Sequence, residues 1–205
     1  SQFVKMFPMN KSLTVGQNRF MNFGGTVFGG NTDFYGQNFE FSYDSFAIVM
    51  RHIDSMVLFT PTGDVDANGD PLTAAVQTSI AGLNGTLYID NPYNKSGRED
   101  FGVFPYFVSE SNGFAHYQKG SIHKNAYDST VFYFEVDAFE VDSMETLDPG
   151  IMGFSGTLVS GGIFPDIRQE VRVMDDLSLG FETETPPGGY PIYGESGRYK
   201  IGRAH

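Results

Sequence analysis

In two stretches of this chain, apolar residues occupy every second position. Residues 39–43 read Phe-Glu-Phe-Ser-Tyr, and residues 132–136 read Phe-Tyr-Phe-Glu-Val. Because successive side chains of a strand point to opposite faces, each run predicts a strand with one buried face. The apolar phase then shifts by one residue after Asp44 and again after Asp137. A strand can change its buried face only at a bulge, a bend or a crossing, so both places should interrupt a sheet.

The two runs also resemble each other. They align at a separation of 93 residues, agree at their core positions and share the Asp before the shift. Each is followed by Asp-Ser-Met, at residues 54–56 and 142–144. A second pattern, Gly-Thr followed by Val or Leu, recurs at Gly25, Gly85 and Gly156. These similarities indicate a repeated β-meander and predict elongation by repetition.

The gaps between the apolar runs are too short for helical crossovers, which predicts antiparallel pairing. Twenty Phe, 11 Tyr and 25 Gly are typical of strands separated by turns. We expect an all-β fold of antiparallel sheets, either a sandwich or an elongated β-roll, with at most one short helix near residues 72–80, where apolar residues recur every fourth position. The expected strands cover residues 20–28, 38–43, 46–50, 53–59, 84–90, 131–141, 154–159 and 169–174.

We expect residues 1–205 to form a single β-rich module. Because the chain starts with Ser1, we interpret it as a fragment of a larger protein. Residues 185–205 are rich in Pro and Gly and should form a loop-rich tail. No run of 18 apolar residues occurs, so no transmembrane helix is predicted.

The charge of the chain argues against nucleic acid as a partner. Thirteen basic residues stand against 25 acidic ones, and a net charge of −12 repels a polyanion. The chain contains no Cys, which removes disulfides, zinc–thiolate sites and cysteine nucleophiles.

Residues 64–70 resemble the first half of a calcium-binding loop. Asp64, Asp66, Asn68 and Asp70 would supply oxygen ligands, and Gly69 would allow the sharp turn. Ala75 stands where such a loop needs its bidentate Glu. Asn-Gly is also a strong hairpin signal, so the segment is either a weak calcium site or a polar hairpin tip. No other cofactor is predicted.

Tyrosines in the polar middle of the chain could bind a ligand. Tyr93, Tyr106, Tyr117 and Tyr127 could stack on sugars, because each ring has a flat apolar face and a hydroxyl group. Ordinary packing between neighbouring strands is the alternative.

The sequence does not predict an enzyme. Glu135 and Asp137 share one face of a strand, but a charged outer face is what alternation predicts there. The segment 153–157 resembles a nucleophile elbow until Thr157 takes the place of its second Gly. The four His residues lack the spacing of a metal site. The glycines at 24–25 and 29–30 indicate strand ends and bulges.

Four short motifs carry a resemblance to a known group of proteins. Asp-Asn-Pro-Tyr-Asn-Lys-Ser-Gly at 90–97, Gly-Gly-Ile-Phe-Pro at 161–165, Ser-Leu-Gly-Phe at 178–181 and Pro-Ile-Tyr-Gly at 191–194 follow one another. Together they resemble a segment of long, poorly characterised, β-rich cell-envelope proteins of Bacteroidota-type bacteria. The strand-like sequence patterns of residues 34–41, Phe-Tyr-Gly-Gln-Asn-Phe-Glu-Phe, and 154–158, Phe-Ser-Gly-Thr-Leu, are similar to those of AsmA and TamB-like envelope proteins. These resemblances imply an extracytoplasmic location, periplasmic or associated with the outer membrane, within a larger envelope protein.

Two functions are consistent with these observations. The first is a non-enzymatic structural module of a larger extracytoplasmic envelope protein, in which the Phe-rich face could line an apolar groove for lipid chains. The alternative is a carbohydrate-binding or adhesion module with surface Tyr residues and a weak calcium-held loop.

Overall fold

A computed structural model describes residues 4–69, 71–116, 129–146, 148, 151–192 and 200–201. The expected all-β, antiparallel fold is confirmed: within these residues, 15 strands form one open sheet and two more form a separate pair. No helix in the described residues has the length and apolar character that crossing a membrane requires. The strands are β1 (Val4–Pro8), β2 (Thr14–Val15), β3 (Phe20–Gly29), β4 (Thr32–Ser42), β5 (Ala47–Val65), β6 (Pro71–Ala75), β7 (Ile80–Ala81), β8 (Leu83–Tyr88), β9 (Tyr106–Ser109), β10 (Gly113–Ala115), β11 (Tyr133–Val136), β12 (Glu140–Val141), β13 (Phe154–Val159), β14 (Ile167–Val173), β15 (Leu179–Gly180), β16 (Tyr190–Pro191) and β17 (Lys200–Ile201).

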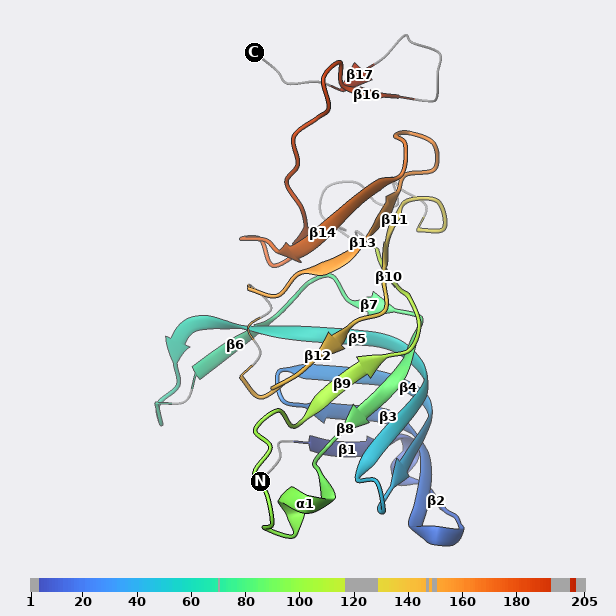
Figure 1. Cartoon of the computed structure of the whole chain (residues 1–205), viewed down its shortest axis with the longest axis vertical. Helices are drawn as coiled ribbons and strands as arrows, with labels where there is room; N and C mark the ends of the chain where they lie inside the picture. Colours follow the sequence, from blue (N-terminus) through green and yellow to red (C-terminus); the bar gives the residue numbers. More distant parts are fainter. Residues whose placement is uncertain are drawn as a thin grey trace.

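The sheet branches at its longest strand, β5, which runs across the middle of the molecule (Figure 1). One side of β5 pairs with β4. The other side pairs in turn with β8, then β7 and then β6. One branch continues from β8 through β9 to β12, and the other from β7 through β10, β11 and β13 to β14 and β15. In Figure 1 the first branch lies below β5 and the second rises above it.

The lower part of the sheet rolls over onto itself. Phe34 on β4 and Phe107 on β9 lie with ring centroids 4.8 Å apart, although β5 and β8 separate their strands in the sheet. At one end of the roll, the Asn31 N–H donates a hydrogen bond to the Met144 carbonyl, with 2.8 Å between N and O. The side chains enclosed here are mainly Phe, Ile, Leu and Met, so apolar burial stabilises the roll.

Five of six repeat phenylalanines, all except Phe132, belong to the hydrophobic core or pack against it. Phe39, Phe41, Phe134 and Phe139 lie between more exposed neighbours, as the sequence predicts for half-buried strands, whereas Ala47 beside Phe46 is buried. Phe39, Phe41 and Phe134 are buried, whereas Phe46, Phe132 and Phe139 are half-buried.

The two phase shifts have different structures. After Asp44 the chain turns tightly, Phe46 adopts a positive φ of 51°, and β5 returns beside β4. After Asp137 the chain does not turn back, because β11 pairs with β10 and β13, whereas β12 pairs with β9 on the other branch. The second shift is therefore a crossing between branches, and the strand expected over 131–141 is divided in two.

The segment near residues 72–80, where at most one short helix was expected, is not helical. Residues 71–75 form β6, which pairs with the end of β5, and residues 80–81 form β7. The apolar residues that recur at every fourth position here do not share one buried face, because Leu72 is 45% exposed while Val76 is 3% exposed. The single described α-helix is α1 (Pro92–Lys95), at whose start Asn91 Oδ1 accepts a hydrogen bond from the Tyr93 N–H at 2.9 Å.

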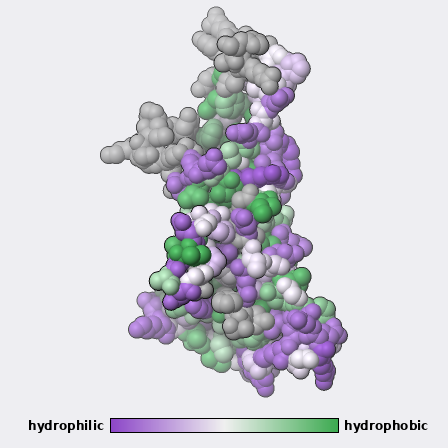
Figure 2. Space-filling view, turned by 90° about the vertical axis from the view of Figure 1, so that its left-hand side faces the viewer, coloured by the Kyte–Doolittle hydropathy of each residue, from purple (hydrophilic) through white to green (hydrophobic). Residues whose placement is uncertain are grey.

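The loop-rich tail expected at 185–205 is described in part. Residues 185–189 form loop and turn, and β16 pairs with β17. Over the face shown in Figure 2, hydrophilic residues alternate with smaller hydrophobic areas along the length of the molecule.

Candidate functional site

The calcium-like segment forms the tip of the β5–β6 hairpin. The Asp66 carboxylate accepts a hydrogen bond from the Asn68 N–H at 2.8 Å, and the Gly69 N–H donates to the Asp66 carbonyl at 3.1 Å. Asp64 is exposed nearby, and Asp70 lies outside the described residues. Over the described part of the chain, no three His, Cys, Asp or Glu side chains form a group that could hold a metal. The hydrogen bonds are those of a polar turn, and calcium binding here stays a prediction.

Two of the four candidate tyrosines, Tyr93 and Tyr106, lie among the described residues, on different elements. Tyr93 lies on α1 and is 52% exposed. Tyr106 lies on β9 and is half-buried, stacked on Tyr88 of the neighbouring strand with ring centroids 4.6 Å apart. Burial and the nearby Tyr88 raise the pKa of Tyr106. Tyr117 and Tyr127 lie outside the described residues.

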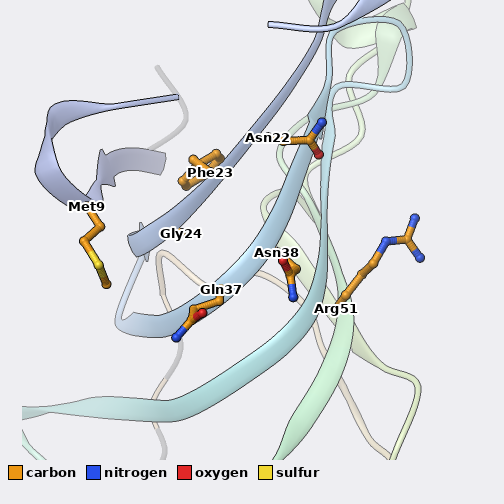
Figure 3. Close-up of a pocket in the computed structure, with 7 residues that line it drawn as sticks. All are labelled: Met9, Asn22, Phe23, Gly24, Gln37, Asn38 and Arg51. Carbon is orange, nitrogen blue, oxygen red and sulfur yellow. The ribbon is translucent and has the colours of Figure 1, made fainter. Parts of the chain in front are cut away.

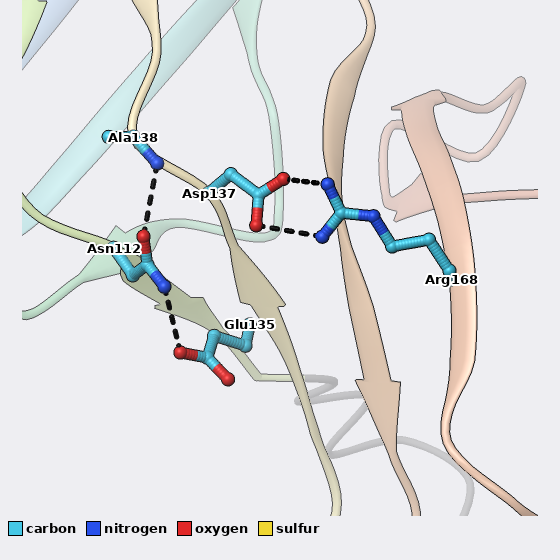
Figure 4. A network of polar contacts seen from close by, with 5 residues as sticks. All are labelled: Asn112, Glu135, Asp137, Ala138 and Arg168. Atoms are coloured by element: carbon cyan, nitrogen blue, oxygen red, sulfur yellow. Dashed lines mark hydrogen bonds and ion pairs between the residues drawn. The ribbon is translucent and has the colours of Figure 1, made fainter.

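Glu135 and Asp137 are held by two different partners at the crossing between the branches (Figure 4). Asn112 donates a hydrogen bond from Nδ2 to Glu135 Oε1 at 2.9 Å, and its Oδ1 accepts one from the Ala138 N–H at 3.2 Å. Both terminal nitrogens of Arg168 bind the Asp137 carboxylate, which raises the pKa of Arg168. These contacts hold together β11, β14 and the start of the crossing. Both carboxylates therefore have a structural role in joining these segments.

A hollow of about 560 Å³ lies beside the amino-terminal segment (Figure 3). It forms where two strand pairings are irregular: the register between β3 and β4 shifts at Phe23–Gly25, and that between β4 and β5 shifts at Tyr35–Gly36. The bulge expected at Gly24–Gly25 is therefore confirmed. The hollow is lined by Met9, Asn22, Phe23, Gly24, Gln37, Asn38 and Arg51.

The lining of this hollow combines polar side chains with the apolar side chains of Met9 and Phe23. Asn22, Gln37 and Asn38 are exposed amides, and Asn38 takes a positive φ of 56°. The Arg51 guanidinium lies 3.9 Å from the Glu40 carboxylate. Phe23 is buried beneath them. Amides supply both donors and acceptors, so the hollow suits a polar, hydroxyl-bearing ligand, and Arg51 suits an acidic group. The sequence reasoning missed this hollow; the adjacent glycines at 24–25 were its only local signal.

Asp33 is a buried carboxyl on β4, with 8% of its surface exposed. Burial raises its pKa, and the hydrogen bond that the Tyr35 hydroxyl donates to Oδ2 at 3.2 Å partly opposes that rise. The folded state thus binds this proton more tightly than the unfolded state does. The free energy of unfolding should fall as pH rises from the ordinary carboxyl pKa through the raised folded one.

We expect Asp33→Asn to remove this pH-dependent step and to make the protein more stable than the wild type at pH 7. Urea midpoints measured between about pH 3 and pH 8 would test this. Asp44→Asn, at an exposed turn position, is the matched control and should leave the step in place. An unchanged step in Asp33→Asn would contradict the assignment.

Comparisons with protein-family models, with curated proteins and with solved structures gave no match for this chain.

Proposed function

We propose that this chain is a non-enzymatic structural module of a larger extracytoplasmic envelope protein. The observation that carries the proposal is the single open sheet, in which β5 belongs to both branches. An open sheet ends in strands with exposed backbone hydrogen-bonding groups, and such edges can be extended by further strands. The resemblance of residues 90–97 and 161–165 to envelope proteins supports the location.

The proposal does not include an apolar groove for lipid chains. Five of the six phenylalanines that would line such a groove are in the core or pack against it, and the sixth, Phe132, is half-buried. Burying one large apolar side chain favours folding by about 2–3 kcal/mol. The buried phenylalanines therefore contribute to the stability of the fold.

Chemical cross-linking of intact source cells, followed by fractionation, tests the proposed function. Lys5 and Lys11 are exposed and lie beside the first edge of the sheet, so they are suitable cross-linking positions. We expect the chain in the envelope fraction, in cross-linked species larger than itself. Recovery in the cytosolic fraction without cross-linked partners would contradict the proposal.

The hollow favours a second candidate, a carbohydrate-binding module. Its amides and Arg51 suit an acidic saccharide, and removal of one hydrogen-bonding partner weakens binding about tenfold. We expect Gln37→Ala and Arg51→Ala each to weaken binding of acidic oligosaccharides on a glycan array by about this factor. Gln77→Ala, an exposed amide outside the hollow, is the control. Absence of binding by the wild type would exclude this candidate.

The calcium-held loop that belongs to the second candidate has its own measurement. If residues 64–70 bind calcium, CaCl₂ should raise the Tm and a chelator should lower it. Calcium at a hundred times its Kd adds about 2.7 kcal/mol to the free energy of unfolding. Asp64→Ala should abolish the response, and a Tm that is indifferent to calcium would remove the metal from the proposal.

A further inference from the structure

The first edge of the sheet exposes an unusual amount of apolar surface. We call residues 4–19 the amino-terminal edge. Within the described residues, β1 pairs with β3 alone, and it forms one end of the longest strand path. Edge strands in natural proteins are normally protected by charge or covered by other segments. Among the residues whose structure is described, 15 large hydrophobic side chains are exposed, and five of them fall within ten residues: Met6, Phe7, Met9, Leu13 and Val15.

The amino-terminal edge is also the basic part of an acidic protein. Lys5, Lys11 and Arg19 are its charged residues, and the first 32 residues contain no Asp or Glu. The remaining 173 residues contain all 25 acidic residues and ten basic ones. An edge that is both apolar and basic is therefore complementary to an acidic surface with apolar residues of its own.

The opposite end of the same strand path has that character. We call residues 174–184 the acidic segment; it contains β15, the last strand of the path. It carries Asp175, Asp176, Glu182 and Glu184, all exposed, and no Lys or Arg. Half-buried Leu179 and Phe181 lie among these carboxylates. Figure 1 places β1 low in the molecule and β14, which pairs with β15, high.

We propose that the amino-terminal edge of one copy of this chain binds the acidic segment of a second copy. The contact joins two different surfaces, so a pair of copies still has one free surface of each kind. Association therefore continues head to tail rather than closing as a twofold dimer. Strand addition at β1 would use the backbone of residues 181–184, because the Leu177 carbonyl and the Leu179 N–H are already bonded to Gln77 and Thr78. The opposite charges would fix the orientation. This inference rests on the proposed structural function and names the partner.

The form of the edge favours a protein strand over an anionic membrane as the occupant. β1 is extended, and its side chains project to both faces, with Met6 on one and Phe7 on the other. A membrane-surface segment instead gathers its apolar residues on one face, usually of a helix. An exposed strand edge also offers backbone groups that a second strand can pair with and lipid cannot.

Sedimentation velocity of the purified chain tests the proposal. We expect association that increases with protein concentration and weakens at least tenfold between about 50 mM and about 500 mM NaCl. Lys5→Glu/Lys11→Glu/Arg19→Glu should abolish it, and so should Asp175→Lys/Asp176→Lys/Glu182→Lys. Mixing the two variants should restore association, because each reversed surface then meets a surface of opposite charge.

The matched control reverses three exposed carboxylates elsewhere, as Asp44→Lys/Glu99→Lys/Asp100→Lys. It changes net charge as much as the acidic-segment variant does and should leave salt-sensitive association in place. A monomeric wild type, association that either variant leaves unchanged, or mixed variants that stay apart would each overturn the proposal. Binding to anionic phosphatidylserine vesicles without self-association would overturn it in favour of a membrane. Cross-links to other envelope proteins alongside a monomeric wild type would leave the structural function standing and remove only self-assembly.

Discussion

Gly36→Ala is expected to destabilise the protein by about 3 kcal/mol, a large fraction of the roughly 5–15 kcal/mol by which ordinary domains are stable. Gly36 lies on β4 where the register with β5 shifts. A Cβ added there would overlap the carbonyl oxygen of His52 and lie 3.0 Å from both Ile53 Cα and Phe39 Cζ. The first two obstacles are backbone atoms of a paired strand, so they cannot rotate away as a surface side chain could.

The measurement is the urea midpoint of unfolding, followed by tyrosine fluorescence and by far-ultraviolet circular dichroism. Gly102→Ala is the matched control, since its added Cβ has no atom within 4 Å and its φ is not in the left-handed region. We expect the control to change stability by less than about 0.5 kcal/mol. Equal midpoints for the two variants would show that the β4–β5 irregularity tolerates a side chain.

Phe107→Ala is expected to cost about 3–5 kcal/mol, as is typical for removal of a fully buried aromatic ring. Phe107 is 0% exposed, and its ring contacts Phe34 across the roll and Phe139 at the crossing, with centroids 4.8 and 6.0 Å away. Phe139 in turn contacts Phe154 at 5.0 Å. The chain of rings therefore joins the rolled part of the sheet to the upper branch, and removing Phe107 opens a cavity at its centre.

A double-mutant cycle separates the ring contact from simple loss of volume. Phe34→Ala and Phe107→Ala should together cost less than the sum of the single variants, with a coupling energy of about 0.5–1.5 kcal/mol. Phe101→Ala, at a Phe that is 40% exposed, is the control and should change stability little. Strict additivity would mean that Phe34 and Phe107 do not pack together.

Alternation of apolar and polar residues predicted the fold class and most of the long strands, because burial of one face is a local property of the sequence. β3, β13 and β14 lie within two residues of their expected bounds. The expected strands at 46–50 and 53–59 are parts of one strand, β5, interrupted in its pairing with β8 between Met50 and Ile53. Strand β1 was missed because its side chains are exposed on both faces, which leaves no alternation to detect.

The remaining differences concern partners distant in sequence. Asp44 and Asp137 stand in similar local sequences, yet one is followed by a hairpin and the other by a crossing. The difference depends on which strand pairs with the segment that follows each Asp. The segment after Asp44 pairs with β4, and the segment after Asp137 pairs with β9. The hollow likewise requires two register shifts on adjacent strand pairs. The glycines at 24–25 indicated the first, whereas the second, at Tyr35–Gly36, cannot be located before the pairing is known.

Because β5 is flanked by partners on both sides over much of its length, its amides should be among the slowest in the protein to exchange with deuterium. An amide at Ile48 or Met50 can reach solvent only if β4 or β8 separates from it, which disrupts the roll. β5 also pairs with β7, the first strand of the upper branch. The chain should therefore lose both branches in one transition, with exchange at β5 reporting the free energy of global unfolding and exchange at β1 reporting only local fraying.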